Sequence, residues 1–298
     1  MTADQVLTAL FNVGIAISVG ATVLSLGMTF TVSQLVAPLN RVWLVIVMVL
    51  LNTVVIPAAA WGIAVVSPMS DTYVPGLVLA TLGAGSAASL KAAQLAGRAD
   101  LPLAVSLVVV LQLANIVAVP LWAGQVVTGA SISAWDIVKS LLALVLLPLV
   151  VGLFIRFRYT EHASDWQEGL VKVANLALVI ALSTGIAANW DTIKAMFASW
   201  VIVTALVIVV IAGGLGVVIG RLLAKRNAGV VTTTGLVSIF RFGSLGLIII
   251  GSQLGGAAVY IGPAITFALV DFILPLALAV EIGHRAAASA GGTAPSTT

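Results

Sequence analysis

The sequence predicts an all-α polytopic membrane protein, and three properties of its 298 residues lead to this fold class. Hydrophobic residues make up 61% of the chain and charged residues 8%, whereas a typical soluble domain has about 25% charged residues. The mean hydropathy is +1.22. Charged residues and Gly, Pro and Asn clusters divide the chain into apolar stretches of the length that a membrane-spanning helix needs, about 20 residues. This composition excludes a soluble enzyme, a nucleic-acid-binding protein and a disordered protein.

Nine apolar stretches are predicted to span the membrane. They cover roughly residues 5–32, 42–66, 72–97, 100–127, 134–157, 166–188, 195–224, 226–253 and 258–284. The first stretch has no Lys or Arg before it and no convincing cleavage site, so we interpret it as a retained helix and not as a signal peptide. Residues 1–285 would form one transmembrane domain. The Ala, Gly, Ser, Thr and Pro residues of segment 286–298 predict a disordered cytoplasmic tail.

The basic residues indicate the orientation in the plasma (inner) membrane. If the N-terminus is outside, the cytoplasmic side holds Arg41, Arg98, Arg156, Arg158, Lys172, Arg221, Lys225, Arg226 and Arg285. The outer side then holds only Lys139 and Lys194. The positive-inside rule therefore predicts an external N-terminus and a cytoplasmic C-terminus.

Two of the nine stretches contain small polar residues beside a cation. The third has Gly83, Gly85, Ser86 and Ser89 before Lys91, and the eighth has Arg241 followed by Gly243, Ser244 and Gly246. Close helix packing is the simpler explanation for such glycines. However, glycine also weakens helices, and broken backbone at membrane depth persists only where protein or a water-filled cavity satisfies it. Because the two stretches run in opposite directions, they predict an inverted-repeat transporter with two crossing discontinuous helices.

Ionisable residues within the predicted spans are candidates for function because a charge at the bilayer centre costs roughly 2.5–3.5 kcal/mol on insertion scales. Lys91 lies near enough to a span end to reach the interface, whereas Arg241 lies far from both ends of its span. Asp271 lies inside the ninth stretch, and we expect it to pair with Arg241 or, second, with Lys91. Such a carboxylate is either a static ion-pair partner or a group that binds protons for coupling.

Short motifs carry a resemblance to a known family. Residues 85–89 (Gly-Ser-Ala-Ala-Ser) resemble a Gly-Gly-Thr-Ala-Ser-Asn crossover motif, residues 25–31 a Met-Gly-Leu-Thr-Leu run, and residues 244–247 an Asn-Ser-Gly-Leu motif. Asn52 lies five residues before Pro57, where the same family has a polar Gln. With these motifs the chain resembles the bile acid:sodium symporter family in its nine-helix form, which includes bacterial carriers of organic anions. The resemblance implies a panel domain (stretches one, five and six) and a core domain (the other six).

The chain differs from that family where the resemblance implies sodium ligands. The corresponding positions are Leu90, Ala104, Val108, Ile239 and Gly243, whose side chains have no oxygen. A shift of one residue replaces the last two by Ser238 and Phe242. A hard cation needs several oxygen ligands, and a sodium ion beside a fixed cation would be repelled. We therefore judge the sodium sites lost, and we hypothesise that Lys91 and Arg241 supply the charge that sodium provides elsewhere.

The predicted function is secondary transport of a small organic anion, a carboxylate or sulfonate, by alternating access. Two half-helix N-termini and two cations favour an anion at the crossover. The carrier would be independent of sodium and would run either as a facilitator or on protons. The alternatives are a sodium- or proton-coupled symporter of bile-acid type and a transport-inactive sensor or scaffold. We predict no cofactor, metal site, enzymatic activity or nucleic-acid partner, since the chain has no cysteine, two histidines and no Gly-x-Ser-x-Gly or His-Glu-x-x-His motif.

Overall fold

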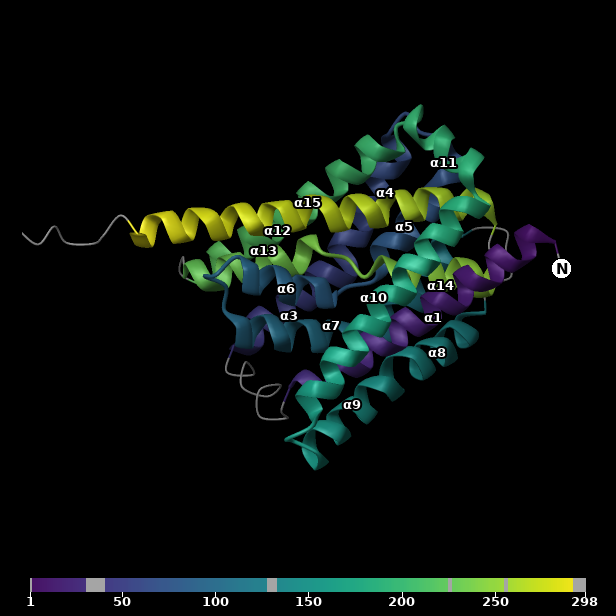
Figure 1. Ribbon diagram of the computed structural model, residues 1–298. Coiled ribbons are helices and arrows are strands. Elements are labelled where there is room, and N and C mark those ends of the chain that lie inside the picture. The colour runs from purple at the N-terminus through teal and green to yellow at the C-terminus, as the bar shows by residue number, and fades with distance from the viewer. Residues whose placement is uncertain (1, 31–40, 128–132, 225–226, 255–256, 292–298) are drawn as a thin grey trace, which may run out of the picture.

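The computed structural model describes residues 2–30, 41–127, 133–224, 227–254 and 257–291, and this part of the chain is helical with no strand (Figure 1). Eight of its continuous or interrupted helices are long and apolar enough to cross a membrane. A ninth candidate span, Asp71–Leu82 with Ala87–Leu95, is bent by 66° at a short break. The predicted fold class, a polytopic helical membrane protein, is confirmed.

The helices follow the predicted spans in order. The first four spans are α1 (Ala3–Thr29), α3 with α4 (Val42–Leu50 and Ile56–Val66), α5 with α6 (Val74–Leu82 and Ala87–Leu95), and α7 (Leu101–Val126). The fifth is α8 with α9 (Ala134–Leu141 and Leu147–Arg158), and the sixth is α10 (Ala163–Ala188). The last three are α12 (Val201–Leu223), α13 with α14 (Ala228–Ile239 and Gly243–Gln253), and α15 (Ala258–Gly291). The short elements are the π-helical turns η2 (Leu51–Val55) and η4 (Leu142–Leu146), the 3₁₀ turn η3 (Asp71–Tyr73), and α11 (Trp190–Phe197).

The structure corrects two predicted boundaries. A separate short helix, α11, precedes the seventh span, which begins at Val201 and not at residue 195. The ninth span continues past residue 284 to Gly291, so residues 286–291 are helical and not the start of a disordered tail. Alanine has the highest helix propensity, so this alanine-rich segment favours a helix even beyond the apolar span. The rest of the predicted tail, residues 292–298, and the last two residues of the predicted first span lie outside the described residues.

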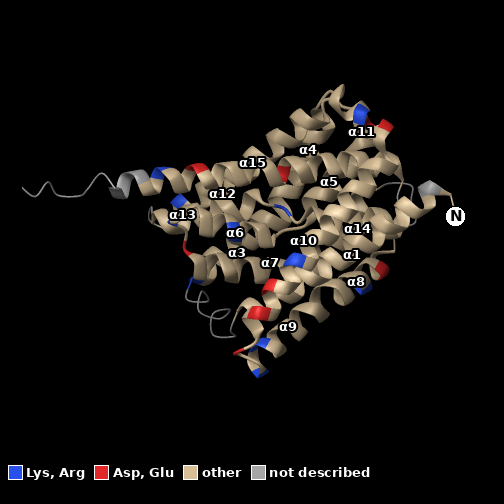
Figure 2. Ribbon diagram, viewed as in Figure 1, with Lys and Arg blue, Asp and Glu red and all other residues tan. Residues whose placement is uncertain are grey.

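The helices form two groups in the fold. Helix α1 packs along α9 and α10 at one edge of the molecule (Figure 1). Helix α5 lies in the other group, where it packs against α4, α7, α14 and α15, while α12 packs along α13. Charged residues gather mainly at the helix ends (Figure 2). Large apolar side chains such as Val117, Leu176 and Ile273 are exposed on the helices. Such a surface suits contact with lipid.

Candidate functional site

The two helix breaks lie against each other in the second group of helices. Residues 83–86 separate α5 from α6, and residues 240–242 separate α13 from α14. The backbone N–H of Phe242 in the second break donates to the carbonyl of Gly83 in the first at 2.8 Å. The crossing of two discontinuous helices, predicted from their glycine and serine residues, is therefore present.

Two glycines of the first break permit this close contact. A Cβ atom on Gly83 would collide with the carbonyl group of Phe242. Gly85 has a φ of +74°, a conformation that side chains disfavour, and a Cβ there would lie 2.7 Å from the carbonyl oxygen of Val108 on α7. Both sites thus need glycine for steric reasons. The other predicted glycines lie alongside, with Gly243 at the start of α14 and Gly246 against the backbone of Leu79.

The side chain of Arg241 is the centre of the crossover. It is 3% exposed and donates three hydrogen bonds to oxygen atoms. Its Nε bonds the carbonyl of Thr81 at 2.8 Å, its Nη1 bonds Oδ1 of Asn52 at 2.9 Å, and its Nη2 bonds the carbonyl of Asn52 at 2.8 Å. The guanidinium thus joins the eighth span to the second span and to the end of α5. A buried cation is tolerated where hydrogen bonds replace its lost water, as they do here.

The second span offers free carbonyl oxygens because of a local irregularity. Pro57 has no N–H with which to bond the carbonyls four or five residues earlier, which belong to Thr53 and Asn52. The span forms the π-helical turn η2 at this point. Arg241 bonds the carbonyl of Asn52, and Nε1 of Trp122 bonds the carbonyl of Thr53 at 2.7 Å. A π-helical turn of this kind is frequent at functional sites.

Asp271 binds the second break in a different way from the one expected. Its carboxylate is 4% exposed, and Oδ1 and Oδ2 both lie 3.0 Å from the backbone nitrogen of Arg241. The salt bridges of the described residues include none between the carboxylate of Asp271 and the guanidinium of Arg241 or the amine of Lys91. The guanidinium turns away because the free oxygens lie on the second and third spans.

The remaining predicted residues lie at or near one of the two breaks. Ser86 caps α6, with its hydroxyl accepting from the N–H of Ala88 at 3.3 Å, and the hydroxyl of Ser89 donates to the carbonyl of Ser86 at 2.7 Å. Ser244 is partly exposed, and its hydroxyl has no hydrogen-bond partner among the described residues. Lys91 is exposed on α6 and, in the described part of the chain, makes no hydrogen bond or ion pair. Of the two predicted cations, the structure therefore places Arg241 in the hydrogen-bond network and Lys91 outside it.

Of the five positions at which we judged sodium ligands lost, Gly243 begins α14 and the other four carry apolar side chains. Ala104, Val108 and Ile239 are buried, and Leu90 is partly buried. The guanidinium of Arg241 occupies the carbonyl of Thr81 and both the carbonyl and the amide oxygen of Asn52, which are oxygens of the kind that a cation takes.

Several residues of the network were not predicted from the sequence. Asn115 on α7 accepts from the N–H of Ala84 at 3.1 Å and donates to its carbonyl at 2.9 Å, while Gln112 donates to the carbonyl of Gly85 at 3.0 Å. Ser238 accepts a hydrogen bond from Asn52 at 3.2 Å. The signal for the first two was a pair of amides, three residues apart, in the middle of the largely apolar fourth span.

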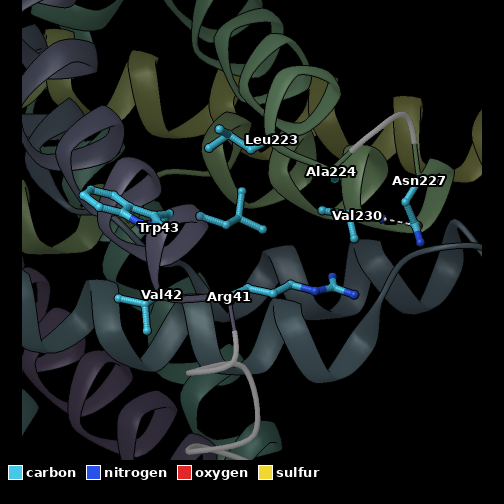
Figure 3. A pocket seen from close by; sticks show the side chains of 8 residues that line it. Arg41, Val42, Trp43, Leu223, Ala224, Asn227 and Val230 are labelled. Carbon is cyan, nitrogen blue, oxygen red and sulfur yellow. Dashed lines mark hydrogen bonds between the residues drawn. The ribbon is translucent and has the colours of Figure 1, made fainter.

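A separate pocket of about 360 Å³ opens where α3 and α13 begin and α12 ends (Figure 3). Its polar side chains already have partners. Arg41 pairs with Asp100 at 3.2 Å, and Asn227 caps α13 by accepting from the N–H of Val230. None of the crossover residues lines this pocket, so it is distinct from the candidate site.

Two interrupted apolar helices that cross inside a helical bundle and hold buried polar groups are typical of secondary transporters. The model of the Sodium Bile acid symporter family matches residues 16–199, more than half of the chain, and the chain belongs to this family. The match includes the first break and ends before Arg241 and Asp271. A search among curated proteins gives no significant match. Members of the family are transporters, so the protein is an integral membrane protein of the transport class.

Proposed function

We propose that the protein is a secondary transporter of small organic anions that works without sodium. The observation that carries this proposal is the guanidinium of Arg241 surrounded by three oxygens, two backbone carbonyls and one amide, at 2.8–2.9 Å. Oxygens of this kind are the ligands that hard cations take. A covalently attached cation at this place supplies the positive charge that a bound sodium ion would supply. It also repels any free cation that enters.

The anion would bind beside the crossover, where the half-helices α6 and α14 begin. The unsatisfied N–H groups of a helix N-terminus favour negative charge. Arg241 itself is buried and bonded in this structure, so its charge would act without direct contact. Lys91 is exposed one turn into α6 and free of partners among the described residues. We therefore assign Lys91, and not Arg241, to direct contact with the carboxylate or sulfonate.

Alternating access would come from movement between two domains. The proposed panel consists of α1, α8, α9 and α10, and the proposed core of the other spans. Hydrogen bonds join the second, third, fourth, eighth and ninth spans of the core to one another. Among the hydrogen bonds and ion pairs between described residues, none joins the proposed panel to these five spans. This supports movement of the core as one unit. The distribution of basic residues supports an external N-terminus and a cytoplasmic C-terminus.

Transport into liposomes tests the sodium independence. Purified protein should accumulate labelled pyruvate or taurocholate, a carboxylate and a sulfonate, equally well with sodium and with potassium in the external buffer. Empty liposomes and an excess of unlabelled probe give the background. Strong stimulation by sodium alone would contradict the proposal and would favour a sodium-coupled symporter.

Replacing Lys91 by alanine should weaken anion binding and leave the fold intact. A hydrogen bond to a charged group contributes roughly 1.5–3 kcal/mol, which corresponds to about 10- to 100-fold in affinity. The melting temperature should not change, since Lys91 makes no hydrogen bond or ion pair with the residues that the structure describes. Lys172→Ala removes an exposed lysine from α10 and is the matched control. Equal binding of the probe by Lys91→Ala and by the unaltered protein would reject the assignment.

A further inference from the structure

The two helix breaks are capped from equivalent positions in the two halves of the chain. Asn115 lies on the span after the first broken helix, 31 residues beyond Ala84, whose backbone it bonds. Asp271 lies on the span after the second broken helix, 30 residues beyond Arg241, whose backbone it bonds. Helices α7 and α15 would be counterparts in an inverted repeat. The amide and the carboxylate therefore occupy the same structural role.

The two caps differ in what they satisfy. The amide of Asn115 accepts from the N–H of Ala84 and donates to its C=O. The carboxylate of Asp271 places both of its oxygens on the single N–H of Arg241. The carbonyl of Arg241 receives no hydrogen bond from any described residue. An ionised carboxylate cannot donate one, whereas a neutral carboxylic acid has one donor and acceptor capacity besides, which is the set that an amide offers.

We propose that Asp271 binds a proton that is transported together with the organic anion. This inference rests on the proposed function. With a proton on one carboxyl oxygen, Asp271 would accept from the N–H of Arg241 and donate to its C=O, as Asn115 does at the first break. The proton comes from water on one side of the membrane and returns to water on the other side. Asp271 is ionised again when the proton leaves.

The charges around the crossover provide the coupling. Among the described groups, Arg241 is the one charged residue in contact with Asp271. The other elements that pack on α15 place their ionisable groups away from Asp271. Lys91 lies on the exposed face of α6, Arg221 at the end of α12 and Asp71 in η3. Asp191 pairs with Lys194 on α11, and α10 carries Asp165, Glu168 and Lys172. On α15 itself, Glu281 pairs with Arg285, and His284 is exposed.

Because Arg241 is the charged neighbour of Asp271, proton binding leaves the Arg241 charge uncompensated and makes the crossover more positive. The anion should then bind more tightly. By linkage, anion binding favours protonation by the same factor.

Infrared spectroscopy tests the proton site without any knowledge of the substrate. The reconstituted protein is titrated with acid, and the carboxylic-acid C=O stretching band is recorded. We expect a band that is present in the unaltered protein and in Asp136→Asn, which removes an exposed carboxylate paired with Lys139. The band should be absent from Asp271→Asn. An identical band in Asp271→Asn would overturn the proposal.

A transport measurement separates this inference from the proposed function. Uptake of labelled pyruvate or taurocholate is driven by a gradient of one pH unit, which supports at most about tenfold accumulation for one coupled proton. Asp271→Asn should lose this stimulation, whereas Asp136→Asn, which alters an exposed carboxylate outside the crossover, should keep both the stimulation and the exchange of labelled for unlabelled probe at equal pH. Stimulation that survives in Asp271→Asn contradicts the proton site. Absence of exchange in the unaltered protein, with the Asp271 band present, contradicts the transport function and leaves the proton site standing.

Discussion

Replacing Arg241 by alanine should produce a protein that sodium stabilises, whereas the unaltered protein should respond equally to sodium and potassium. Removal of the guanidinium leaves two carbonyls and one amide oxygen without their donor. Removing one member of a buried charged network typically costs about 3–5 kcal/mol. A sodium ion could enter the vacated position and recover part of this loss. At ten times its dissociation constant it would restore about 1.4 kcal/mol.

Melting temperatures in detergent, with sodium and potassium compared at equal ionic strength, measure this effect. Arg221→Ala is the matched control because Arg221 is an exposed arginine at the end of α12. Its melting temperature should be close to that of the unaltered protein in both salts. A large loss of stability in Arg241→Ala with no preference for sodium would show that the arginine does not occupy an ion site. If the variant is too unstable to purify, Arg241→Lys keeps a cation and should remain insensitive to sodium.

Replacing Gly83 by alanine should disrupt the crossover. The added methyl group meets the backbone of Phe242, which cannot rotate away as a side chain can. The hydrogen bond between the N–H of Phe242 and the carbonyl of Gly83 would lengthen or break. Overpacking of a tight interior typically costs about 1–3 kcal/mol, and the broken bond adds to that figure. We expect a clear fall in melting temperature and loss of transport.

Gly214→Ala provides the comparison for this prediction. Gly214 lies in α12, and a Cβ atom there would meet nothing within 4 Å. The same chemical change should be neutral or stabilise the helix by up to about 1 kcal/mol, since alanine favours helix more than glycine does. Both variants are measured by thermal unfolding and by uptake of the labelled probes. Equal stability of Gly83→Ala and Gly214→Ala would mean that the two breaks are not in close contact in the membrane.

Local composition was enough to predict the helical membrane architecture and the position of the two helix breaks. Apolar stretches of span length, separated by charges, leave few alternatives to a helical membrane bundle. Glycines near Lys91 in the third stretch and near Arg241 in the eighth indicated where two helices are interrupted. These features are visible in the sequence because each depends on neighbours along the chain.

The partners of each polar group could not be predicted in the same way, because they depend on distances between helices. Asp271 was expected to pair with the side chain of Arg241, and the structure joins it to the backbone of that residue. The π-helical turn before Pro57 decides where the guanidinium points. Pro57 indicates an irregular helix in the sequence, but it does not identify the donor that bonds the free carbonyls. Asn115 was missed because an amide in an apolar helix has many possible partners. Lys91 was grouped with Arg241 by sequence proximity to a break, although its side chain is exposed.

Among the described residues, no hydrogen bond or ion pair joins α1, α8, α9 and α10 to the hydrogen-bonded spans of the proposed core, and this has a consequence for the energetics of turnover. In the proposed mechanism, one group of helices slides past the other without breaking a described hydrogen bond or ion pair. The barrier to sliding then comes from the packing of side chains between the groups and from the surrounding acyl chains. Bilayer thickness and fluidity should therefore govern the rate more than any single bond in the protein. A detergent micelle, which imposes neither constraint, is then a poor medium in which to judge how fast this molecule works.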